Sequence, residues 1–141
     1  MSGDPTVFIV DDEAVVADSL RWLIESVGLK VETFSSADEF LARYRQERPG
    51  CLVLDVRMPV MSGLELQERL KGLGVTLPII FITGHGGVQT AVRALQRGAI
   101  DFVEKPFDDQ RMLDLVQKAI AQDAEQRRRV VAQADAAARF A

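Results

Sequence analysis

The sequence predicts an α/β fold in which a parallel sheet carries helices on both faces. Five short apolar runs are each followed by a longer segment with helical periodicity, in strict alternation. Most of these runs contain almost no polar residue, which is typical of strands buried on both faces. Alternation of this kind joins parallel strands through helical crossovers. With 141 residues, the chain has the length of one such domain.

The first half of the chain supplies two of the predicted strand–helix pairs. Residues 6–10 form a buried strand, and residues 30–34 alternate polar and apolar side chains, as an edge strand does. The helix between them ends at Gly28, and its apolar residues recur at helical spacing: Val16, Leu20, Leu23, Ile24 and Val27. Ser36 and Glu39 fit a capping box that begins the second helix, whose buried side is predicted to carry Phe40, Leu41 and Tyr44.

The third and fourth pairs follow the same pattern. Residues 51–55 form an apolar strand that runs into Asp55. Ser62 and Glu65 fit a second capping box, and the helix they begin has its apolar side chains at Leu66, Leu70 and Leu73. Residues 78–82 form the fourth strand, and the helix after it is predicted to bury Val88, Ala91, Val92 and Leu95 and to end at Gly98.

The last strand is predicted at residues 99–104, and a final helix begins at Asp109 and packs through Met112, Leu113, Val116 and Ile120. From about residue 122 the chain contains good helix formers, few large apolar side chains and no Gly or Pro. Two interpretations of residues 122–141 stay open. They form either a frayed, solvated extension or a helical linker that pairs with a copy of itself through Val130, Ala134 and Ala137 or Ala138. The domain itself is therefore assigned to residues 1–121.

Composition argues against several classes of protein. The chain has 17 basic and 21 acidic residues, and a net charge of −4 argues against nucleic-acid binding by this segment. The only cysteine, Cys51, lies in an apolar run and is expected to be a buried thiol in a reducing compartment. No apolar stretch approaches the ~20 residues of a membrane span, so a cytoplasmic protein without membrane contact is expected. Trp22 is expected to be half-buried, and the only histidine, His85, is interpreted as a loop residue.

Polar side chains follow the apolar strands at the points where the strands end. Asp11 and Asp12 follow the first strand, Asp55 ends the third, Thr83 follows the fourth, and Lys105 follows the last. Because the carboxyl ends of parallel strands share one edge of a sheet, these five side chains are expected to meet there, where open α/β sheets bind ligands.

Three carboxylates in one crevice repel one another and call for a cation. All-oxygen ligation by few side chains suits Mg²⁺, which prefers to share its shell with a phosphate. A lysine and a hydroxyl opposite the metal complete an anion site. With Asp55 as a nucleophile between them, the set predicts phosphoryl transfer onto aspartate.

These motifs resemble the receiver domain of two-component response regulators, the CheY-like superfamily. The resemblance covers residues 6 to about 121 and rests on the acidic pair Asp11-Asp12, D-V-R-M-P at Asp55, T-G-H-G at Thr83 and K-P-F at Lys105. It implies a doubly wound, flavodoxin-like sheet of five parallel strands in the order 2-1-3-4-5. It also implies a signalling domain that catalyses only its own phosphorylation and dephosphorylation, rather than an enzyme.

The resemblance assigns the chemistry to named positions. Asp55 is expected to accept the phosphoryl group from a histidine of a sensor kinase. Mg²⁺ is expected to be held by Asp11 or Asp12, by Asp55 and by the backbone carbonyl of Arg57, with Asp12 as the usual direct ligand.

Four further positions are carried over in the same way. Thr83 and Lys105 are expected to contact the phosphoryl oxygens. Phe102 falls at the aromatic switch position, which responds to Thr83 when the phosphoryl group is present. The Lys105–Pro106 peptide bond is expected to be cis.

The residues of these motifs resemble those of the FixJ-type branch of the family. The resemblance rests on F-S-S-A-D-E-F-L, D-V-R-M-P, T-G-H-G and D-F-V-E-K-P-F. Members of that branch carry a helical linker and a LuxR-type helix-turn-helix output domain. This implies that residues 122–141 lead towards a DNA-binding domain that this chain does not include. On phosphorylation, two receivers are expected to pair through the fourth helix and fifth strand. An NtrC-type regulator and a stand-alone receiver are the alternatives within the family.

Two other classes of protein share some of these features. A haloacid-dehalogenase-like phosphatase also combines Asp, Thr, Lys and Mg²⁺, but its nucleophile ends strand one in a D-x-D pattern, whereas strand one here ends D-D-E. A nucleotide-binding module could use the glycine-rich turn at residues 84–87 to hold phosphate. That turn matches neither the dinucleotide nor the P-loop fingerprint.

Overall fold

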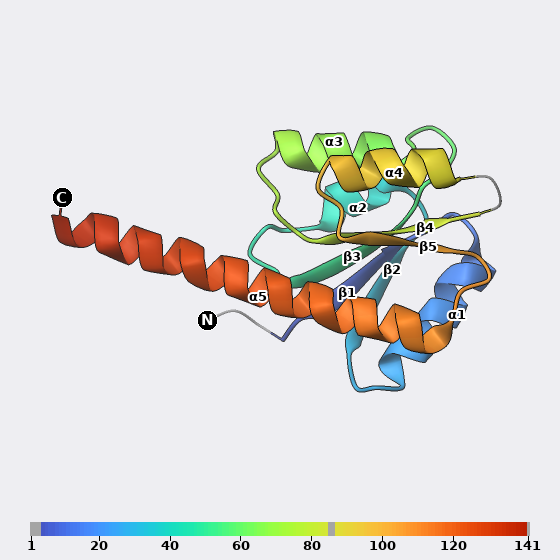
Figure 1. Ribbon diagram of the computed structural model, residues 1–141, viewed down its shortest axis with the longest axis horizontal. Coiled ribbons are helices and arrows are strands. Elements are labelled where there is room, and N and C mark those ends of the chain that lie inside the picture. The colour runs from blue at the N-terminus through green and yellow to red at the C-terminus, as the bar shows by residue number, and fades with distance from the viewer. Residues whose placement is uncertain (1–3, 85–86, 141) are drawn as a thin grey trace.

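The computed structural model describes residues 4–84 and 87–140 and contains one parallel sheet of five strands (Figure 1). The strands are β1 (Thr6–Val10), β2 (Lys30–Phe34), β3 (Gly50–Asp55), β4 (Ile79–Thr83) and β5 (Asp101–Glu104). The helices are α1 (Ala14–Glu25), α2 (Ala37–Arg43), α3 (Gly63–Gly72), α4 (Val88–Gln96) and α5 (Asp109–Phe140). The strand order is β2-β1-β3-β4-β5, which confirms the predicted doubly wound sheet.

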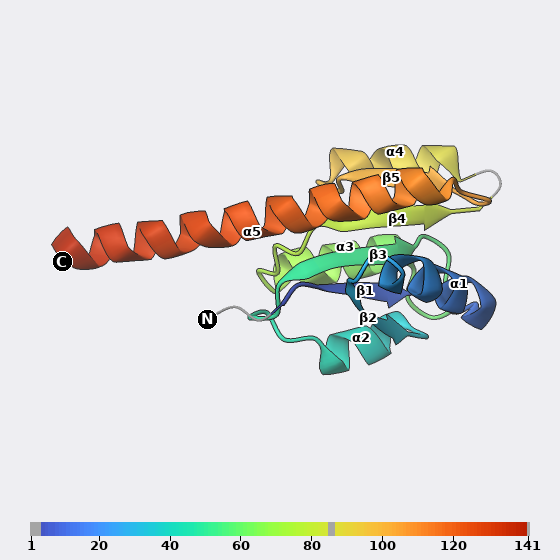
Figure 2. The same ribbon diagram turned by 90° about the horizontal axis from the view of Figure 1, so that it is seen from below.

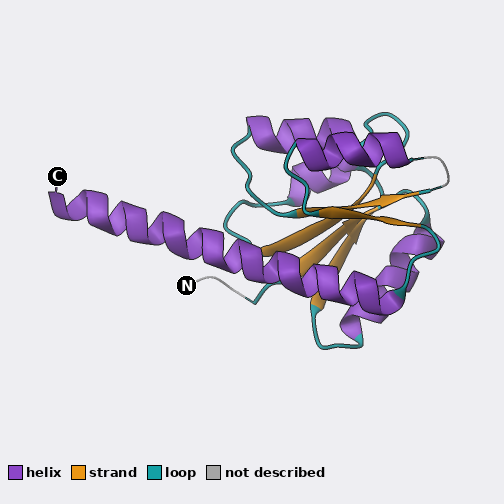
Figure 3. Ribbon diagram, in the orientation of Figure 1, coloured by secondary structure: helices purple, strands orange, loops and turns teal. Residues whose placement is uncertain are grey.

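The helices cover the sheet in two layers, as Figures 1 and 2 show. α1 and α5 lie on one face, over a core that includes Leu20, Met112 and Val116. α2, α3 and α4 lie on the other face, over a core that includes Phe40 and Leu66. Strands β1, β3 and β4 are fully buried because both of their faces are covered. Figure 3 shows the described loops between strands and helices at the two ends of the sheet.

The fifth strand is shorter than predicted. It begins at Asp101, not at Ala99. The Ala99 backbone N–H donates to the carbonyl of Ala94, after Gly98 has turned the chain at a φ of 104°. Ala99 therefore belongs to the turn that ends α4, because a glycine with positive φ closes a helix in this way.

The predicted helix starts are confirmed at one helix and half-confirmed at another. Ser62 and Glu65 form the full capping box of α3, with each side chain accepting from the other residue's backbone N–H. Ser36 accepts from the Glu39 backbone N–H, but the Glu39 carboxylate accepts from Ser35 instead of closing the box. The Glu39 side chain thus binds Ser35, the residue before the N-cap, and this contact still connects the chain before the helix to the first turn of α2.

Four residues expected to be buried or half-buried are exposed. Trp22 was expected to be half-buried, and its exposed fraction is 77%. One apolar residue in each of three predicted helical patterns is also exposed: Val27, Leu73 and Val92. Val27 and Leu73 lie beyond the last helical residue of α1 and α3, so the helical period no longer fixes the direction of their side chains.

The helix α5 continues without a break far beyond the sheet (Figure 1). Its side chains attach it to the amino-terminal end of β3, whereas Asp55 lies at the carboxyl-terminal end of that strand. The carboxylate of Asp123, which is 1% exposed, accepts from the Gly50 backbone N–H at 2.9 Å and from Arg127 Nε at 2.7 Å. Arg127 also donates to the carbonyls of Gln46 and Arg48, both at 2.9 Å. We call this set of contacts, made by Asp123 and Arg127, the α5 clamp.

Candidate phosphoryl-acceptor site

The strand register brings the acidic residues together. Val10 of β1 lies beside Leu54 of β3, so Asp11 and Asp55 follow as neighbours at the same edge of the sheet. Their carboxylates and that of Asp12 have oxygen atoms within 4.8 Å of one another. Asp11 and Asp55 are buried, whereas Asp12 is exposed. The predicted cluster of three carboxylates is therefore present.

This cluster has the chemistry of a site for a hard divalent cation. All its ligand atoms are oxygens, which suit Mg²⁺. One of them, Asp11 Oδ2, is buried and has no hydrogen-bond partner among the described residues, although the other oxygen of Asp11 accepts from the Glu13 backbone N–H at 2.9 Å. A buried carboxylate oxygen without a hydrogen-bond donor is costly, and its ion pair with Lys105 Nζ is long, at 3.5 Å. A bound cation would offset that cost.

Lys105 approaches the carboxylates from the last strand. Its Nζ lies 3.5 Å from Asp11 Oδ2 and 3.8 Å from Asp55 Oδ2. A third carboxylate, that of Glu13, lies 3.2 Å away. The Lys105–Pro106 peptide bond that follows is cis. One lysine thus partly neutralises an edge of the sheet that holds several acidic side chains.

The environment of Asp55 favours its protonated form. Burial, followed by the nearby charge of Asp11, raises the pKa of Asp55 to about 7. Lys105 and a hydrogen bond from the Arg57 backbone N–H, at 3.2 Å from Asp55 Oδ1, oppose this rise. Burial lowers the pKa of Lys105, but the carboxylates of Asp55 and Asp11 outweigh it, so the pKa of that ammonium group is raised. At neutral pH the lysine is therefore charged, and Asp55 is poised between its two forms.

Backbone packing beside Asp55 requires a glycine. A Cβ atom on Gly63 would lie 2.2 Å from the Asp55 carbonyl oxygen. The Gly63 N–H donates to the carbonyl of Val56 at 2.9 Å, so the first turn of α3 lies directly against the end of β3. Any larger residue at this position would displace the backbone that carries Asp55.

Thr83 is enclosed at the end of β4. It is 1% exposed, and its hydroxyl donates to the carbonyl of Gly84 at 3.2 Å. A Cβ on Gly87 would lie 1.6 Å from Thr83 Oγ1, so the hydroxyl occupies the space that Gly87 leaves free. The neighbouring His85 and Gly86, which belong to the predicted glycine-rich turn, lie outside the described residues. Phe102 is partly buried and packs against the core under α2, α3 and α4.

Val60, in the loop after Asp55, has an unfavourable backbone conformation. Its φ is 70°, and its side chain is 92% exposed. A β-branched residue in the left-handed region is strained by about 1–2 kcal/mol, and no burial compensates. We expect Val60→Asn to raise the free energy of unfolding by about 0.5–1 kcal/mol, because Asn tolerates this region. Urea denaturation measures this difference. The control is Val15→Asn, at an exposed valine of α1, which should change the free energy of unfolding little. Equal effects of the two substitutions would show that Val60 is not strained.

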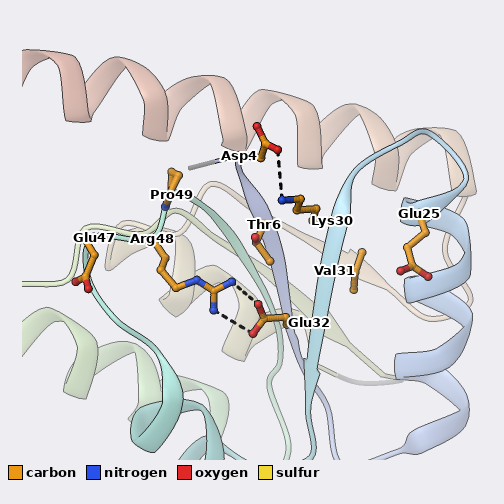
Figure 4. Close-up of a pocket in the computed structure, with 9 residues that line it drawn as sticks. All are labelled: Asp4, Thr6, Glu25, Lys30, Val31, Glu32, Glu47, Arg48 and Pro49. Atoms are coloured by element: carbon orange, nitrogen blue, oxygen red, sulfur yellow. Dashed lines mark hydrogen bonds and ion pairs between the residues drawn. The ribbon is translucent and has the colours of Figure 1, made fainter. Parts of the chain in front are cut away.

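A separate hollow lies at the other edge of the sheet (Figure 4). It has a volume of about 610 Å³ and is lined by charged residues of the β1, β2 and β3 ends. Two ion pairs cross it, Arg48 with Glu32 and Lys30 with Asp4, the second at 3.3 Å. Since these charges are already paired, and since Asp55 lies at the far end of β3, this hollow does not contribute to the acidic cluster.

Comparison with known proteins identifies the family. The response regulator receiver domain family matches residues 7–117. The chain belongs to this family. It is thus a receiver domain of the two-component response regulators, close to the FixJ and TodT type. Members of this family are signalling proteins rather than enzymes that act on a separate substrate, which weighs against the phosphatase alternative.

Three relatives illustrate the likeness. The response regulator protein TodT of Pseudomonas putida is 47% identical over 121 residues, which are 86% of this chain and 53% of that protein. The transcriptional regulatory protein FixJ of Azorhizobium caulinodans is 43% identical over 135 residues, 96% of this chain and 64% of that protein. The solved structure of the response regulator StyR superposes with a TM-score of 0.90 at 47% identity, over 94% of this chain and 67% of that one. The receiver spans about half the length of the curated relatives it matches.

Several residues that shape this site were not found from the sequence. Glu13 is the carboxylate nearest to Lys105, and Gly63 and Gly87 allow the close approaches described above. Gly87 lies in the predicted glycine-rich turn, but nothing in the motif indicates its close approach to Thr83. The contact between Glu13 and Lys105 depends on strands that the sheet brings together. Among the described residues, no helix is long and apolar enough to cross a membrane.

Proposed function

We propose that this receiver accepts a phosphoryl group on Asp55. Support comes from the position of this carboxylate, which is buried beside Asp11 and within 3.8 Å of the Lys105 ammonium group. The bond from the phosphorus to its donor breaks as the bond to Asp55 forms, and the donor, a histidine of a sensor kinase or a small acyl phosphate, leaves with the electron pair. Only the ionised carboxylate can attack, so the neighbouring positive charges support the reaction by favouring that form.

The proposed cofactor is Mg²⁺, held by Asp12, Asp11 and Asp55 together with the backbone carbonyl of Arg57. When bound, such an ion neutralises negative charge on the transferring phosphoryl oxygens and on the acceptor. Lys105 would contact one of these oxygens as a fixed positive charge. The Thr83 hydroxyl, at the end of the neighbouring strand, would donate a hydrogen bond to another.

The proposed output is a change of surface. A phosphoryl group adds a charge of about −1.5 to −2, which attracts the Thr83 hydroxyl away from the Gly84 carbonyl. Phe102, which is only partly buried, would then turn into the space beside β4. The surface of α4 and β5 would change, and two receivers would pair through it. We propose a sensor histidine kinase as the partner upstream.

For the whole protein, we propose control of transcription through a DNA-binding output domain. Relatives such as FixJ carry the name of transcriptional regulatory proteins and are longer than this chain. Residues 1–121 would be the receiver, and residues 122–141 a helical linker towards the output domain. The cytoplasm remains the proposed location. A receiver of the NtrC type or a stand-alone receiver would differ in the segment after residue 121 and not in the chemistry at Asp55.

The test is incubation with acetyl phosphate and Mg²⁺, followed by the intact mass of the protein. We expect the wild type to gain one phosphoryl group in the presence of Mg²⁺ and to gain none in excess chelator. Asp55→Asn should gain none in either condition, while Asp101→Asn, a control carboxylate on β5 that is paired with Arg111, should behave as the wild type. Labelling of Asp55→Asn, or turnover of acetyl phosphate without a labelled protein, would contradict the proposal.

A further inference from the structure

A groove beside the extended part of α5 belongs to none of the sites described so far. Its volume is about 650 Å³. One wall is formed by Pro5 and Pro49 of the domain, and the other by Ile120, Ala124, Val131 and Ala132 of α5. Charged residues of α5 line the groove as well, namely Asp123, Arg127, Arg128 and Asp135. Val131 lies between Arg128 and Asp135 in the chain and is 60% exposed. The α5 clamp holds the helix at a fixed position over Gly50, so the groove is already formed in a single chain.

We propose that this groove receives α5 of a second copy of the chain, running in the opposite direction. The two helices would cross at Val131 and Ala132, and each would extend into the groove of the other. Such an arrangement is a two-fold, isologous interface, in which the same surface of both copies is used. It requires no phosphoryl group, and it is distinct from the α4–β5 surface proposed above.

The charges on the groove favour this direction over the parallel one. Arg128 and Asp135 lie at the groove, three residues before Val131 and three after Ala132. In a parallel pair, each would lie beside its own copy, so that like charges face each other. In an antiparallel pair centred between Val131 and Ala132, Arg128 of each chain faces Asp135 of the other. Opposite charges at such positions set the direction of helix pairing.

The neighbouring residues allow this contact. Arg128 already pairs with Glu125 at 2.6 Å in its own chain, but its side chain is 70% exposed. A guanidinium group has five N–H donors, so it can keep Glu125 and also bind a second carboxylate. The small side chains of Ala124 and Ala132 allow two helix backbones to approach closely. The helix is also long enough, because its last residue, 140, would lie level with Asp123 of the partner chain.

Charge reversal provides the test. The dissociation constant of the unphosphorylated 141-residue chain is measured by analytical ultracentrifugation, in the Asp55→Asn background so that the result does not depend on phosphorylation. Arg128→Asp and Asp135→Arg should each weaken association about tenfold or more, since two facing contacts turn repulsive. Arg129→Asp is the matched control. Arg129 also pairs with Glu125 and is 66% exposed, but it does not line the groove, so this variant should associate as the parent does.

Mixing the variants makes the prediction specific. Equal amounts of the Arg128→Asp and Asp135→Arg chains should associate as tightly as the parent, because each reversed charge then meets its opposite. The double variant should also recover. Since a misfolded chain would not recover on mixing, these two results separate loss of contact from loss of fold. A parent that stays monomeric, single variants that match Arg129→Asp, or a mixture that stays apart would each overturn the proposal.

Cross-linking determines the direction independently. Val131→Cys lies near the proposed two-fold axis and should form a disulfide with its own copy under oxidation. Ala124→Cys should not, because the two sulfur atoms would lie about two helical turns from the axis on opposite sides, beyond the reach of a disulfide. The native Cys51 is buried and does not interfere. Linkage through Ala124→Cys would indicate a parallel pair and overturn the antiparallel arrangement. If a longer natural chain does not associate while this one does, another segment of that chain covers the groove, and the proposal fails for the whole protein.

Discussion

Arg127→Ala is expected to lower the free energy of unfolding by about 2–4 kcal/mol, because it leaves the buried Asp123 carboxylate without its cation. In the native chain Arg127 lies 2.7 Å from that carboxylate and also donates to the carbonyls of Gln46 and Arg48. Removing it leaves Asp123 with the Gly50 N–H as its one remaining donor among the described contacts. Truncating one partner of a buried pair costs more than the pair contributes, since the other charge stays desolvated.

Urea denaturation at pH 7 measures this effect. Arg129→Ala is the control, because Arg129 lies on the same helix, is 66% exposed and does not line the groove described above; its loss should change stability by less than about 0.5 kcal/mol. The double variant Asp123→Asn/Arg127→Ala should recover part of the loss, since it removes the unpaired charge. If the two arginine variants unfold at the same urea concentration, the α5 clamp does not stabilise the domain.

Asp55→Asn is expected to stabilise the protein at pH 8 in the absence of divalent cations, by about 2–4 kcal/mol. Burial and the charge of Asp11 raise the pKa of Asp55 to about 7, from a usual value of 3.8. The folded state therefore binds a proton more tightly than the unfolded state does. Ionisation of Asp55 therefore lowers the free energy of unfolding as the pH rises above about 4. The loss reaches its full size only above about pH 7. Asn removes the charge and thus its cost.

The difference in unfolding free energy between Asp55→Asn and wild type, measured from pH 4 to pH 8, tests this. It should be near zero at pH 4, grow towards pH 7 and then stay constant. Saturating Mg²⁺ should narrow the gap at pH 8 by stabilising the wild type more than the variant. Asp12→Asn removes the same charge from an exposed neighbour and should stabilise far less. A gap that is constant across the pH range would show that Asp55 has an ordinary pKa.

The fold was predictable because each part of the sequence indicates the same structure. The apolar runs of β1, β3 and β4 and the cap at Ser62 agree with the strands and helices found. The acidic cluster was predictable for a related reason, since a parallel sheet brings the ends of its strands to one edge. Errors occurred where a residue lies outside the repeating pattern, as for Ala99 in the turn after α4 and for Trp22 on the outer side of α1.

The contacts that could not be predicted join segments far apart in the chain. Asp123 reaches Gly50 across 73 residues, and Lys105 reaches Glu13 across 92. Neither residue type nor spacing indicates such a pair, because its geometry depends on how helices lie on the sheet. The tail after residue 121 shows the same limit. Its composition favours a helix, but its attachment through Arg127 depends on carbonyls of the loop before β3.

The length of α5 gives it mechanical leverage. The helix begins at Asp109, after the Lys105 strand end, and continues to residue 140 (Figure 1). At about 1.5 Å per residue, it extends roughly 27 Å before Arg127 and roughly 20 Å after it. The clamp at Asp123 and Arg127 is thus a fulcrum with arms of similar length. A tilt of about 10° around it would swing the far tip by roughly 3–4 Å. A small shift of the helix near Lys105 would therefore reach the tip in the opposite direction, at about three quarters of its size.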